Sequence, residues 1–209
     1  MIKWVIFDIG GVVIDIAPKD VVTRLSTVSG LPVEKIAQLF DFKLVKTDDA
    51  QTFFEQFVVG RISVDEYVKS MQWVFPNKVS REEIIEAELL CLGADRKDTL
   101  ALIRELERSV GLGCFSNTHQ IHWDKLISER EWYSHFKHIY ASHECGLAKP
   151  DPEVFHFMLR ELGTKPEEMV FLDDVEKNVA AAKSCGWHAV HFRDAAQARS
   201  ELSPLMRGK

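Results

Sequence analysis

Short apolar segments, rich in β-branched and aromatic residues, alternate with amphipathic helical segments along most of this chain. Strands separated by helices predict a parallel sheet, because two parallel neighbours need a long crossover connection, usually a helix. We therefore expect an α/β fold with a doubly wound parallel sheet of the Rossmann type. The expected strands are residues 2–8, 111–116, 138–142, 169–173 and 187–192, and the expected helices between them are 98–110, 152–162 and a segment ending before Gly186.

The segment from Pro18 to about Leu92 differs from the rest, because its apolar residues recur only at helical spacing. Ser63 with Glu66, and Ser80 with Glu83, have the spacing of capping boxes and predict the first turns of two helices. We expect an α/β core of residues 1–16 and 94–209 with a helical domain of residues 17–93 inserted after the first strand. The expected apolar faces are Ile36, Leu39, Phe40 and Leu44; Phe53, Phe54, Phe57 and Val58; Tyr67, Val68 and Met71; and Ile85, Leu89 and Leu92.

Composition excludes some classes of protein. The chain has 209 residues, 46% of them hydrophobic and 28% charged, which is typical of a folded globular protein. A net charge of −6 argues against nucleic acid as a partner, since phosphate backbones require a concentrated basic face. No segment approaches the ~20 apolar residues of a membrane helix, and the apolar run from Ile2 to Ile16 is interpreted as strand, not signal peptide. A cytoplasmic location without membrane contact is therefore expected.

Four cysteines are widely spaced and form no C-x-x-C pair, so neither a zinc site nor a disulfide framework is indicated. We expect them to be reduced and mostly buried. They are Cys91, Cys114, Cys145 and Cys185.

Reactive side chains lie at the ends of several expected strands. The four segments are VIFDIGGVV (5–13), CFSNT (114–118), GLAKPD (146–151) and VFLDD (170–174). Taken singly each is weak, because a strand-terminal aspartate is often a helix cap or a turn former; Asp151, before Pro152, is expected to be such a cap. In a parallel sheet, however, the carboxyl ends of the strands meet at one edge, where ligands bind. Their joint occurrence favours one site that contains all four segments.

Electrostatics suggest what such a site would do. Each carboxylate that approaches a phosphate meets a repulsion of ~4 kcal/mol per charge pair at ~4 Å and an effective dielectric constant of 20. Asp8, Asp173 and Asp174 have no cation among them in the sequence pattern, so a Mg²⁺ ion, with Lys149 on its other side, is expected to supply positive charge. Asp8 could then attack as a covalent nucleophile and form an aspartyl phosphate. Other groups for holding a phosphoryl oxygen are Ser116 and the backbone amide of Asn117.

These motifs, in this order, resemble those of the haloacid dehalogenase-like hydrolase superfamily, and the resemblance spans essentially the whole chain. In particular they resemble those of the C1-cap branch, of the α-D-glucose-1-phosphate phosphatase type with a D-x-G first motif. The resemblance implies a small phosphorylated metabolite as substrate and residues 17–93 as a cap that closes over it. The roles it implies are a nucleophile at Asp8; phosphate binding by Ser116, Asn117 and Lys149; a Mg²⁺ ion bound by Asp8, the Gly10 carbonyl and Asp174; Asp173 acting through water or Lys149; and Asn178 in support.

Gly10 departs from the commonest form of the first motif, in which an aspartate at this position serves as general acid and base. General acid catalysis is typically worth ~10²–10⁴-fold, so its loss predicts a slow enzyme rather than an inactive one. Three other residues are candidates to donate the proton: Asp15, His119 and His143.

Other functions remain open at this point. A dehalogenase would need no acidic pair such as Asp173 and Asp174, and a response-regulator receiver has its acidic pair near the first strand. A non-catalytic protein of the same fold that binds a phosphorylated ligand or partner, and a phosphotransferase, are the alternatives that stay. The substrate itself is not predicted, because Phe42, Lys43, Lys46 and Trp73 are interpreted as core or solvated residues of the helical insertion.

Overall fold

In a computed structural model, which describes residues 1–40 and 53–207, the centre of the protein is a sheet of five parallel strands. The strand order is β5-β4-β1-β6-β7, so the first strand of the chain is central. This confirms the predicted α/β fold and parallel sheet. The strands are β1 (Trp4–Phe7), β4 (Gly111–Ser116), β5 (His138–Ala141), β6 (Met169–Asp173) and β7 (His188–His191).

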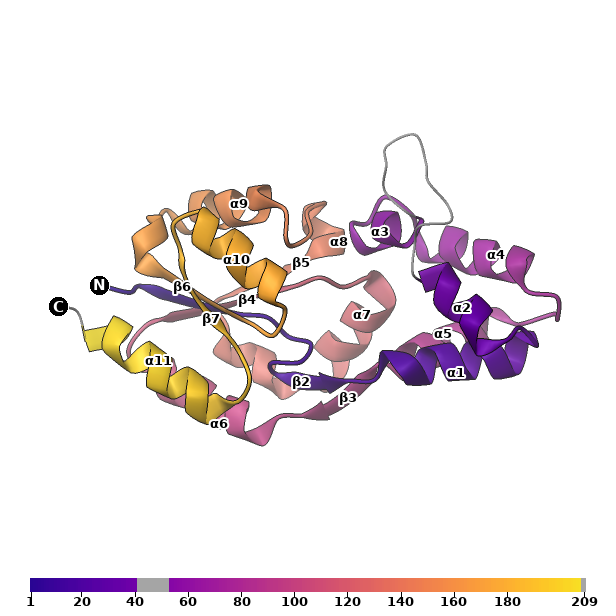
Figure 1. The fold of residues 1–209 in the computed structure, drawn as a ribbon, viewed down its shortest axis with the longest axis horizontal. Helices are drawn as coiled ribbons and strands as arrows, with labels where there is room; N and C mark the ends of the chain where they lie inside the picture. The colour runs from indigo at the N-terminus through magenta and orange to yellow at the C-terminus, as the bar shows by residue number, and fades with distance from the viewer. Residues whose placement is uncertain (41–52, 208–209) are drawn as a thin grey trace.

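Helices cover both faces of the sheet, as Figure 1 shows, with α9 and α10 on one side and α6 and α11 on the other. Two separate clusters of buried apolar residues pack against the two faces, one around Phe155 and Phe171 and one around Leu102 and Leu112. The helices are α6 (Lys97–Leu106), α7 (Gln120–Glu129), α8 (Ser142–Cys145), α9 (Pro152–Leu162), α10 (Glu176–Ser184) and α11 (Ala195–Arg207), with 3₁₀ turns at Glu131–His135 and Pro166–Glu168.

The chain leaves this core through a two-stranded antiparallel ladder that the sequence did not predict. It consists of β2 (Ile14–Ile16) and β3 (Leu92–Asp95). The interpretation of Ile2 to Ile16 as strand is therefore only partly right. A tight turn, with Gly11 at φ 74°, separates β1 from β2 and reverses the backbone.

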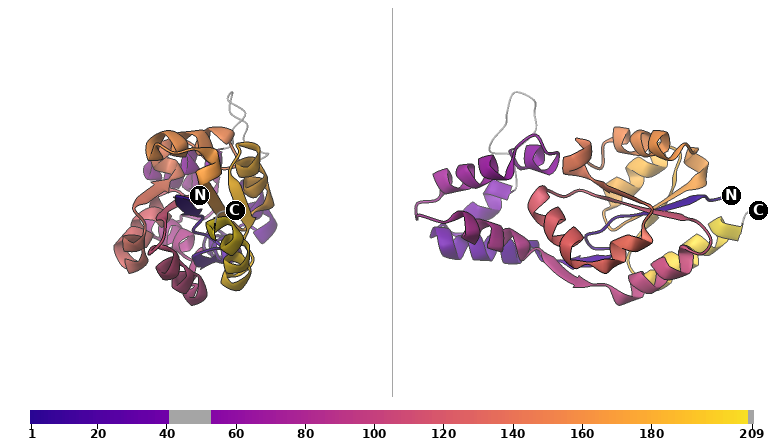
Figure 2. Two further views of the ribbon diagram at one scale, coloured as in Figure 1. Left: turned by 90° about the vertical axis from the view of Figure 1, so that its left-hand side faces the viewer. Right: turned by 180° about the vertical axis from the view of Figure 1, so that it is seen from behind.

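Between the two ladder strands lies a helical bundle, the helical insertion. Its described residues, 17–40 and 53–91, form α1 (Pro18–Ser29), α2 (Val33–Phe40), α3 (Phe53–Val58), α4 (Val64–Val74) and α5 (Arg81–Leu89). These helices form a lobe at the end of the molecule opposite the two termini (Figures 1 and 2). The lobe has its own apolar cluster, which also includes Ile121 of α7. The division into domains at residues 16/17 and 93/94 remains a prediction.

Local sequence signals set several helix starts as expected. Both capping boxes are present, with the backbone amide of Glu66 donating to Ser63 Oγ at 3.2 Å and that of Glu83 donating to Ser80 Oγ at 3.1 Å. Asp151 caps α9 by accepting a hydrogen bond from the backbone amide of Glu153 at 2.9 Å. Such caps satisfy amides that have no partner inside the helix.

Other expectations need correction. The helix expected over 98–110 ends at Leu106, and α7 and α11 had not been foreseen. Of the four cysteines, which are all free, only Cys114 is buried, and the others are half-buried. In the described ranges 1–40 and 53–207, no helix combines the length and apolar character needed to cross a membrane. Phe42, Lys43, Leu44 and Lys46 lie outside the described residues.

Candidate active site

The ends of three adjacent strands bring most of the predicted site residues together. Asp8 follows β1, Ser116 ends β4 and Asp173 ends β6, and β4 and β6 are the two neighbours of β1. Asp174 follows directly on β6, and Lys149 comes from the loop between α8 and α9. The expected convergence at one edge of the sheet is therefore present.

The ammonium group of Lys149 lies between two of the carboxylates. Its Nζ is 2.8 Å from Asp8 Oδ1 and 2.8 Å from Asp173 Oδ2, and it donates a third hydrogen bond to the Phe115 carbonyl at 3.1 Å. The expectation that the carboxylates have no cation among them is thus wrong. Burial by itself lowers the pKa of Lys149, but the charges of Asp8 and Asp173 outweigh it and hold that pKa above its ordinary value. Lys149 is therefore a buried, charged and fully bonded cation.

Asp173 has both carboxylate oxygens occupied by the protein. Oδ1 accepts from the Val175 amide at 2.8 Å, Oδ2 accepts from Lys149, and the Asn178 side-chain amide donates to both oxygens at 3.0 Å. These bonds fix the orientation of a carboxylate that is 0% exposed. Its position matches the expected role through Lys149 better than direct ligation of a metal.

Asn117 holds the loop that carries Lys149. Its side-chain Oδ1 accepts from the Lys149 amide at 2.9 Å, and its Nδ2 donates to the Lys149 carbonyl at 2.7 Å. Two such bonds to one residue fix both the position and the direction of the backbone. The sequence pointed to the backbone amide of Asn117, and this role of its side chain was missed.

Three carboxylates in this group have oxygen atoms within 4.8 Å of one another: Asp8, Asp173 and Asp174. If all are ionised, three negative charges and the one positive charge of Lys149 leave a net charge of −2. Burial, with a smaller contribution from the charge of Asp173, raises the pKa of Asp8 to about 7 against the lowering effect of Lys149. Burial, together with the charge of Asp173, also raises the pKa of Asp174. Oxygen donors with uncompensated negative charge fit Mg²⁺, which prefers carboxylate ligands.

Gly11 allows Asp174 to approach the loop after β1. A Cβ at this position, where φ is 74°, would lie 2.1 Å from Asp174 Oδ2. Only glycine combines this conformation with such a close contact. Gly10 has no such conformation, and a Cβ there would meet only the Ile16 side chain, at 3.1 Å.

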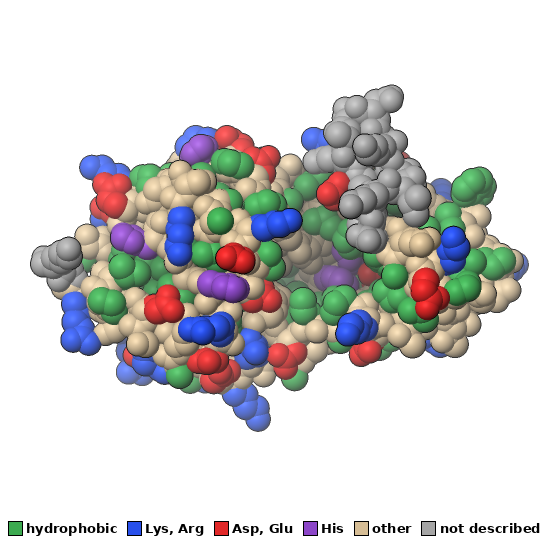
Figure 3. Space-filling model, in the orientation of Figure 1, with side chains coloured by type: hydrophobic (Ala, Val, Ile, Leu, Met, Phe, Trp, Pro, Cys, Tyr) green, Lys and Arg blue, Asp and Glu red, His purple; other side chains and the backbone are tan. Residues whose placement is uncertain are grey.

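A cavity of ≈ 310 Å³ lies directly over these residues. Asp8, Gly10, Ser116, Asn117, Lys149 and Asp174 line it from the core, and Phe54 and Val58 of α3 line it from the helical insertion. Figure 3 shows a hollow between the two parts of the molecule, in which histidine and acidic side chains are visible. This volume is in the range of small-molecule sites.

A family model described as haloacid dehalogenase-like hydrolase matches residues 2–186. The chain belongs to the haloacid dehalogenase-like hydrolases. It is 27% identical over 212 residues to D-ribitol-5-phosphate phosphatase of Bacteroides thetaiotaomicron, and this alignment covers 99% of each protein. Among solved structures, it is similar to a predicted hydrolase of this family from Porphyromonas gingivalis, with a TM-score of 0.83 and 26% identity over 100% of both chains.

A second solved structure is a family enzyme from Bacteroides thetaiotaomicron in complex with magnesium and inorganic phosphate, with a TM-score of 0.81 and 24% identity over 93% of this chain and 96% of that one. The resemblance to the superfamily and the prediction of a hydrolase are confirmed. The C1-cap branch and the glucose-1-phosphate type remain predictions.

The structure separates the three candidate proton donors of this haloacid dehalogenase-like hydrolase. Asp15 is exposed and pairs with Arg96, whose Nε lies 3.2 Å from its Oδ1. His143 is half-buried and lies outside the cavity lining, with Nδ1 3.2 Å from the Thr118 carbonyl. Only His119 of the three lines the cavity together with Asp8.

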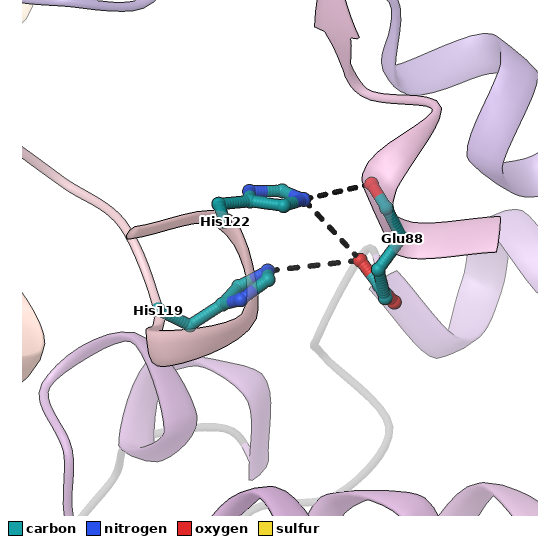
Figure 4. A group of neighbouring side chains, drawn as sticks. All are labelled: Glu88, His119 and His122. Carbon is teal, nitrogen blue, oxygen red and sulfur yellow. Dashed lines mark hydrogen bonds and ion pairs between the residues drawn. The ribbon is translucent and has the colours of Figure 1, made fainter. Parts of the chain in front are cut away.

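The surroundings of His119 were not predicted from the sequence. Glu88 of α5 and His122 of α7 lie next to it, and their side chains point toward one another in Figure 4. Ser142 was also missed: its hydroxyl is 2.9 Å from the Thr118 amide and carbonyl and 2.7 Å from the Val58 carbonyl. It therefore ties the loop before His119 to the helical insertion. A lone glutamate on a helix and a hydroxyl at a strand end carry no signal from which these contacts could have been predicted.

Proposed function

We propose that this hydrolase is a Mg²⁺-dependent phosphatase that cleaves a small phosphate monoester through an aspartyl phosphate on Asp8. The observation that carries the proposal is Lys149, whose Nζ lies 2.8 Å from both Asp8 and Asp173, beside Asp174. A nucleophilic carboxylate must keep its charge in a buried site and must meet a phosphate dianion. The buried ammonium supports both requirements.

The hydrogen bonds of Asp8 suggest which oxygen attacks. Oδ1 accepts from the Ile9 amide at 2.7 Å and contacts Lys149, whereas Oδ2 has no hydrogen bond among the described residues. Oδ2 therefore forms the bond to phosphorus, and the ester oxygen leaves with the electron pair of its bond. Ser116 and the Asn117 amide hold phosphoryl oxygens, and Lys149 stabilises the charge that builds up on them.

The donor set of the site suits one Mg²⁺ ion held by Asp8, Asp174 and the Gly10 carbonyl, with Asp173 acting through Lys149. When bound, this ion neutralises charge on the phosphoryl oxygens and offsets their repulsion from the carboxylates. The similar family enzyme that was solved with magnesium and inorganic phosphate supports this part of the proposal.

The name of the relative from Bacteroides thetaiotaomicron supports a sugar or polyol phosphate as the substrate class. The helical insertion serves as the cap, since Phe54 and Val58 already form part of the cavity wall. Enclosure by such a cap excludes water and favours small metabolites over macromolecules.

The test is phosphate release from a panel of phosphorylated metabolites, with Mg²⁺ and with a chelator. We expect turnover only with Mg²⁺, and mass spectrometry of a trapped intermediate should find phosphate on Asp8. Activity in the chelator would refute the metal, and a label on another residue would refute the nucleophile. Binding of Mg²⁺ and phosphate without turnover would favour the non-catalytic alternative, and transfer to an acceptor other than water would favour a phosphotransferase.

A further inference from the structure

His119 is buried without a hydrogen bond. It is 1% exposed, and neither of its ring nitrogens has a hydrogen-bond partner among the described residues. Its ring stacks on Phe57 of the helical insertion, with centroids 4.6 Å apart, and lies next to His122. Buried polar atoms without partners are rare and costly, so such an atom in the wall of an active-site cavity suggests a partner that arrives with the substrate.

Glu88 is the acidic group that faces His119. Its Oε2 lies 3.6 Å from His119 Nε2 and 3.8 Å from His122 Nε2, and its Oε1 accepts a hydrogen bond from Tyr67. His122 Nε2 also lies 2.8 Å from the Glu88 carbonyl. Tyr67 and Glu88 belong to the helical insertion, whereas His119 directly precedes α7 and His122 lies on it.

The protonation state of this group follows from its burial. Burial raises the pKa of Glu88, and it lowers the pKa of His119 to about 3 and that of His122 to about 4. Of the other titratable groups, Tyr67 lowers the pKa of Glu88 through its hydrogen bond and His143 lowers that of His119, while Glu88 in turn raises the pKa of Cys91. Both histidines are therefore neutral at neutral pH, and burial favours the uncharged form of Glu88 as well, so a proton held by the pair resides on Glu88 rather than on His119 in the absence of substrate.

We propose that Glu88 and His119 form a proton-donating pair that protonates the leaving oxygen of the substrate, a task for which Gly10 offers no side chain. The proposal rests on the phosphatase function proposed above. A phosphate dianion in the cavity favours the imidazolium, so Glu88 passes its proton to His119. His119 then gives its proton to the ester oxygen as the bond from that oxygen to phosphorus breaks. In the second step a water molecule attacks the aspartyl phosphate. The hydroxyl of the water bonds to phosphorus, and the remaining proton of the water returns to the pair. The bond between Asp8 and phosphorus breaks, and Asp8 keeps its electrons.

In this proposal His119 is the catalytic residue and Glu88 is a positioning residue that acts through it. Because Glu88 comes from the helical insertion and His119 from the core, the pair is complete only when the two parts are together. Proton donation is thereby coupled to enclosure of the substrate.

The test is the dependence of kcat/KM on the leaving group, from p-nitrophenyl phosphate to alkyl phosphates. This quantity covers the steps up to departure of the leaving group, so later hydrolysis of the aspartyl phosphate does not mask the effect. We expect a shallow dependence for the wild type. For His119→Asn we expect a loss of ~10²–10⁴-fold on alkyl phosphates and less than about tenfold on p-nitrophenyl phosphate, which leaves without protonation.

Two further variants address the pair and a possible loss of structure. Glu88→Gln keeps the size of the side chain but cannot supply a proton, and it should lose alkyl phosphate turnover selectively and change the pH profile for these substrates. In the wild type, alkyl phosphate turnover should fall at high pH as the pair loses its proton, and p-nitrophenyl phosphate turnover should not show this fall. Gly10→Asp in the His119→Asn background should restore alkyl phosphate turnover, since an aspartate there needs only a small shift of Ile16.

His143→Asn is the matched control, because His143 Nδ1 lies 3.2 Å from the carbonyl of the neighbouring Thr118 but His143 is outside the cavity lining. It should leave the leaving-group dependence unchanged. Equal losses of His119→Asn on both kinds of ester would indicate a structural role and would overturn the proposal, as would a steep dependence in the wild type. Absence of turnover of every ester would instead overturn the phosphatase function itself.

A bound metal is the competing explanation, because Glu88, His119 and His122 could each offer one ligand atom within 4.8 Å of the others. Elemental analysis of the purified protein separates the two. The proton-donating pair would be overturned by stoichiometric zinc that is lost in His119→Asn but retained in Asp174→Asn. Absence of bound zinc from the wild type supports the pair.

Discussion

Replacement of Lys149 by methionine removes one buried positive charge and leaves two carboxylates behind. Nζ lies 2.8 Å from an oxygen of Asp8 and of Asp173. At an effective dielectric constant of ~20, one such pair is worth about 6 kcal/mol before the cost of desolvation. Measured losses on removing one partner of a buried pair are ~3–5 kcal/mol. We expect the lower end, about 3 kcal/mol in the free energy of unfolding at neutral pH, because Asp8 can relieve the repulsion by taking up a proton.

The sign of the pH dependence follows from Asp8. Its pKa in the folded protein is already raised to about 7, and loss of Lys149 raises it further, so the folded state binds a proton more tightly than the unfolded state. The stability of Lys149→Met should therefore fall as pH rises from ~4, the unfolded value, through the raised pKa. The deficit relative to the wild type should be larger at about pH 8 than at about pH 5.

Urea unfolding followed by circular dichroism, with a chelator present, measures both effects. The matched control is Lys125→Met, since Lys125 pairs with Glu129 on the exposed surface of α7, and it should change stability by less than about 0.5 kcal/mol. If Lys149→Met and Lys125→Met had the same stability at about pH 8, the assignment of Lys149 as a buried counter-charge would be refuted.

Four more predictions concern the metal and the nucleophile. Asp8→Asn should abolish turnover in the panel assay while circular dichroism remains that of the wild type, because an amide cannot form the acyl phosphate. Asp174→Asn should lower Mg²⁺ affinity more than Asp173→Asn in calorimetric titrations. Asp173→Asn should instead be the less stable variant, with a loss of ~3 kcal/mol or more in the free energy of unfolding, because the hydrogen bonds to a buried carboxylate are lost. Mg²⁺ affinity should increase with pH, by at most about tenfold per pH unit, until about pH 7 and should then level off, because a proton on Asp8 competes with the ion. An affinity that does not vary over this range would contradict the raised pKa of Asp8. Gly11→Ala should weaken Mg²⁺ binding because the new Cβ would displace Asp174. Gly146→Ala is the control, because Gly146 has a similar positive φ but no atom within 4 Å of the added Cβ, so it reports backbone strain alone. Equal effects of the two variants would argue against a contact between Gly11 and Asp174.

Features that depend on neighbours along the chain could be predicted from the order of the residues. The boxes at Ser63 and Ser80 and the cap at Asp151 were readable, because a cap joins residues two or three positions apart. The alternation of strands and helices predicted the parallel sheet, and in such a sheet the strand ends meet at one edge. The grouping of Asp8, Ser116 and Asp173 therefore followed from the order of the motifs.

The hydrogen bonds and ion pairs of these side chains depend on the folded arrangement of the whole chain. That Lys149 lies between Asp8 and Asp173, and that the side chain of Asn117 holds the Lys149 backbone, depends on differences of an ångström in loop positions. The antiparallel ladder of β2 and β3 depends on where the chain returns from the helical insertion. Glu88 and His119 meet for the same reason, since one belongs to the insertion and the other to the core. Contacts between residues far apart in the sequence are set by the packing of whole elements against one another, and no local pattern along the chain records them.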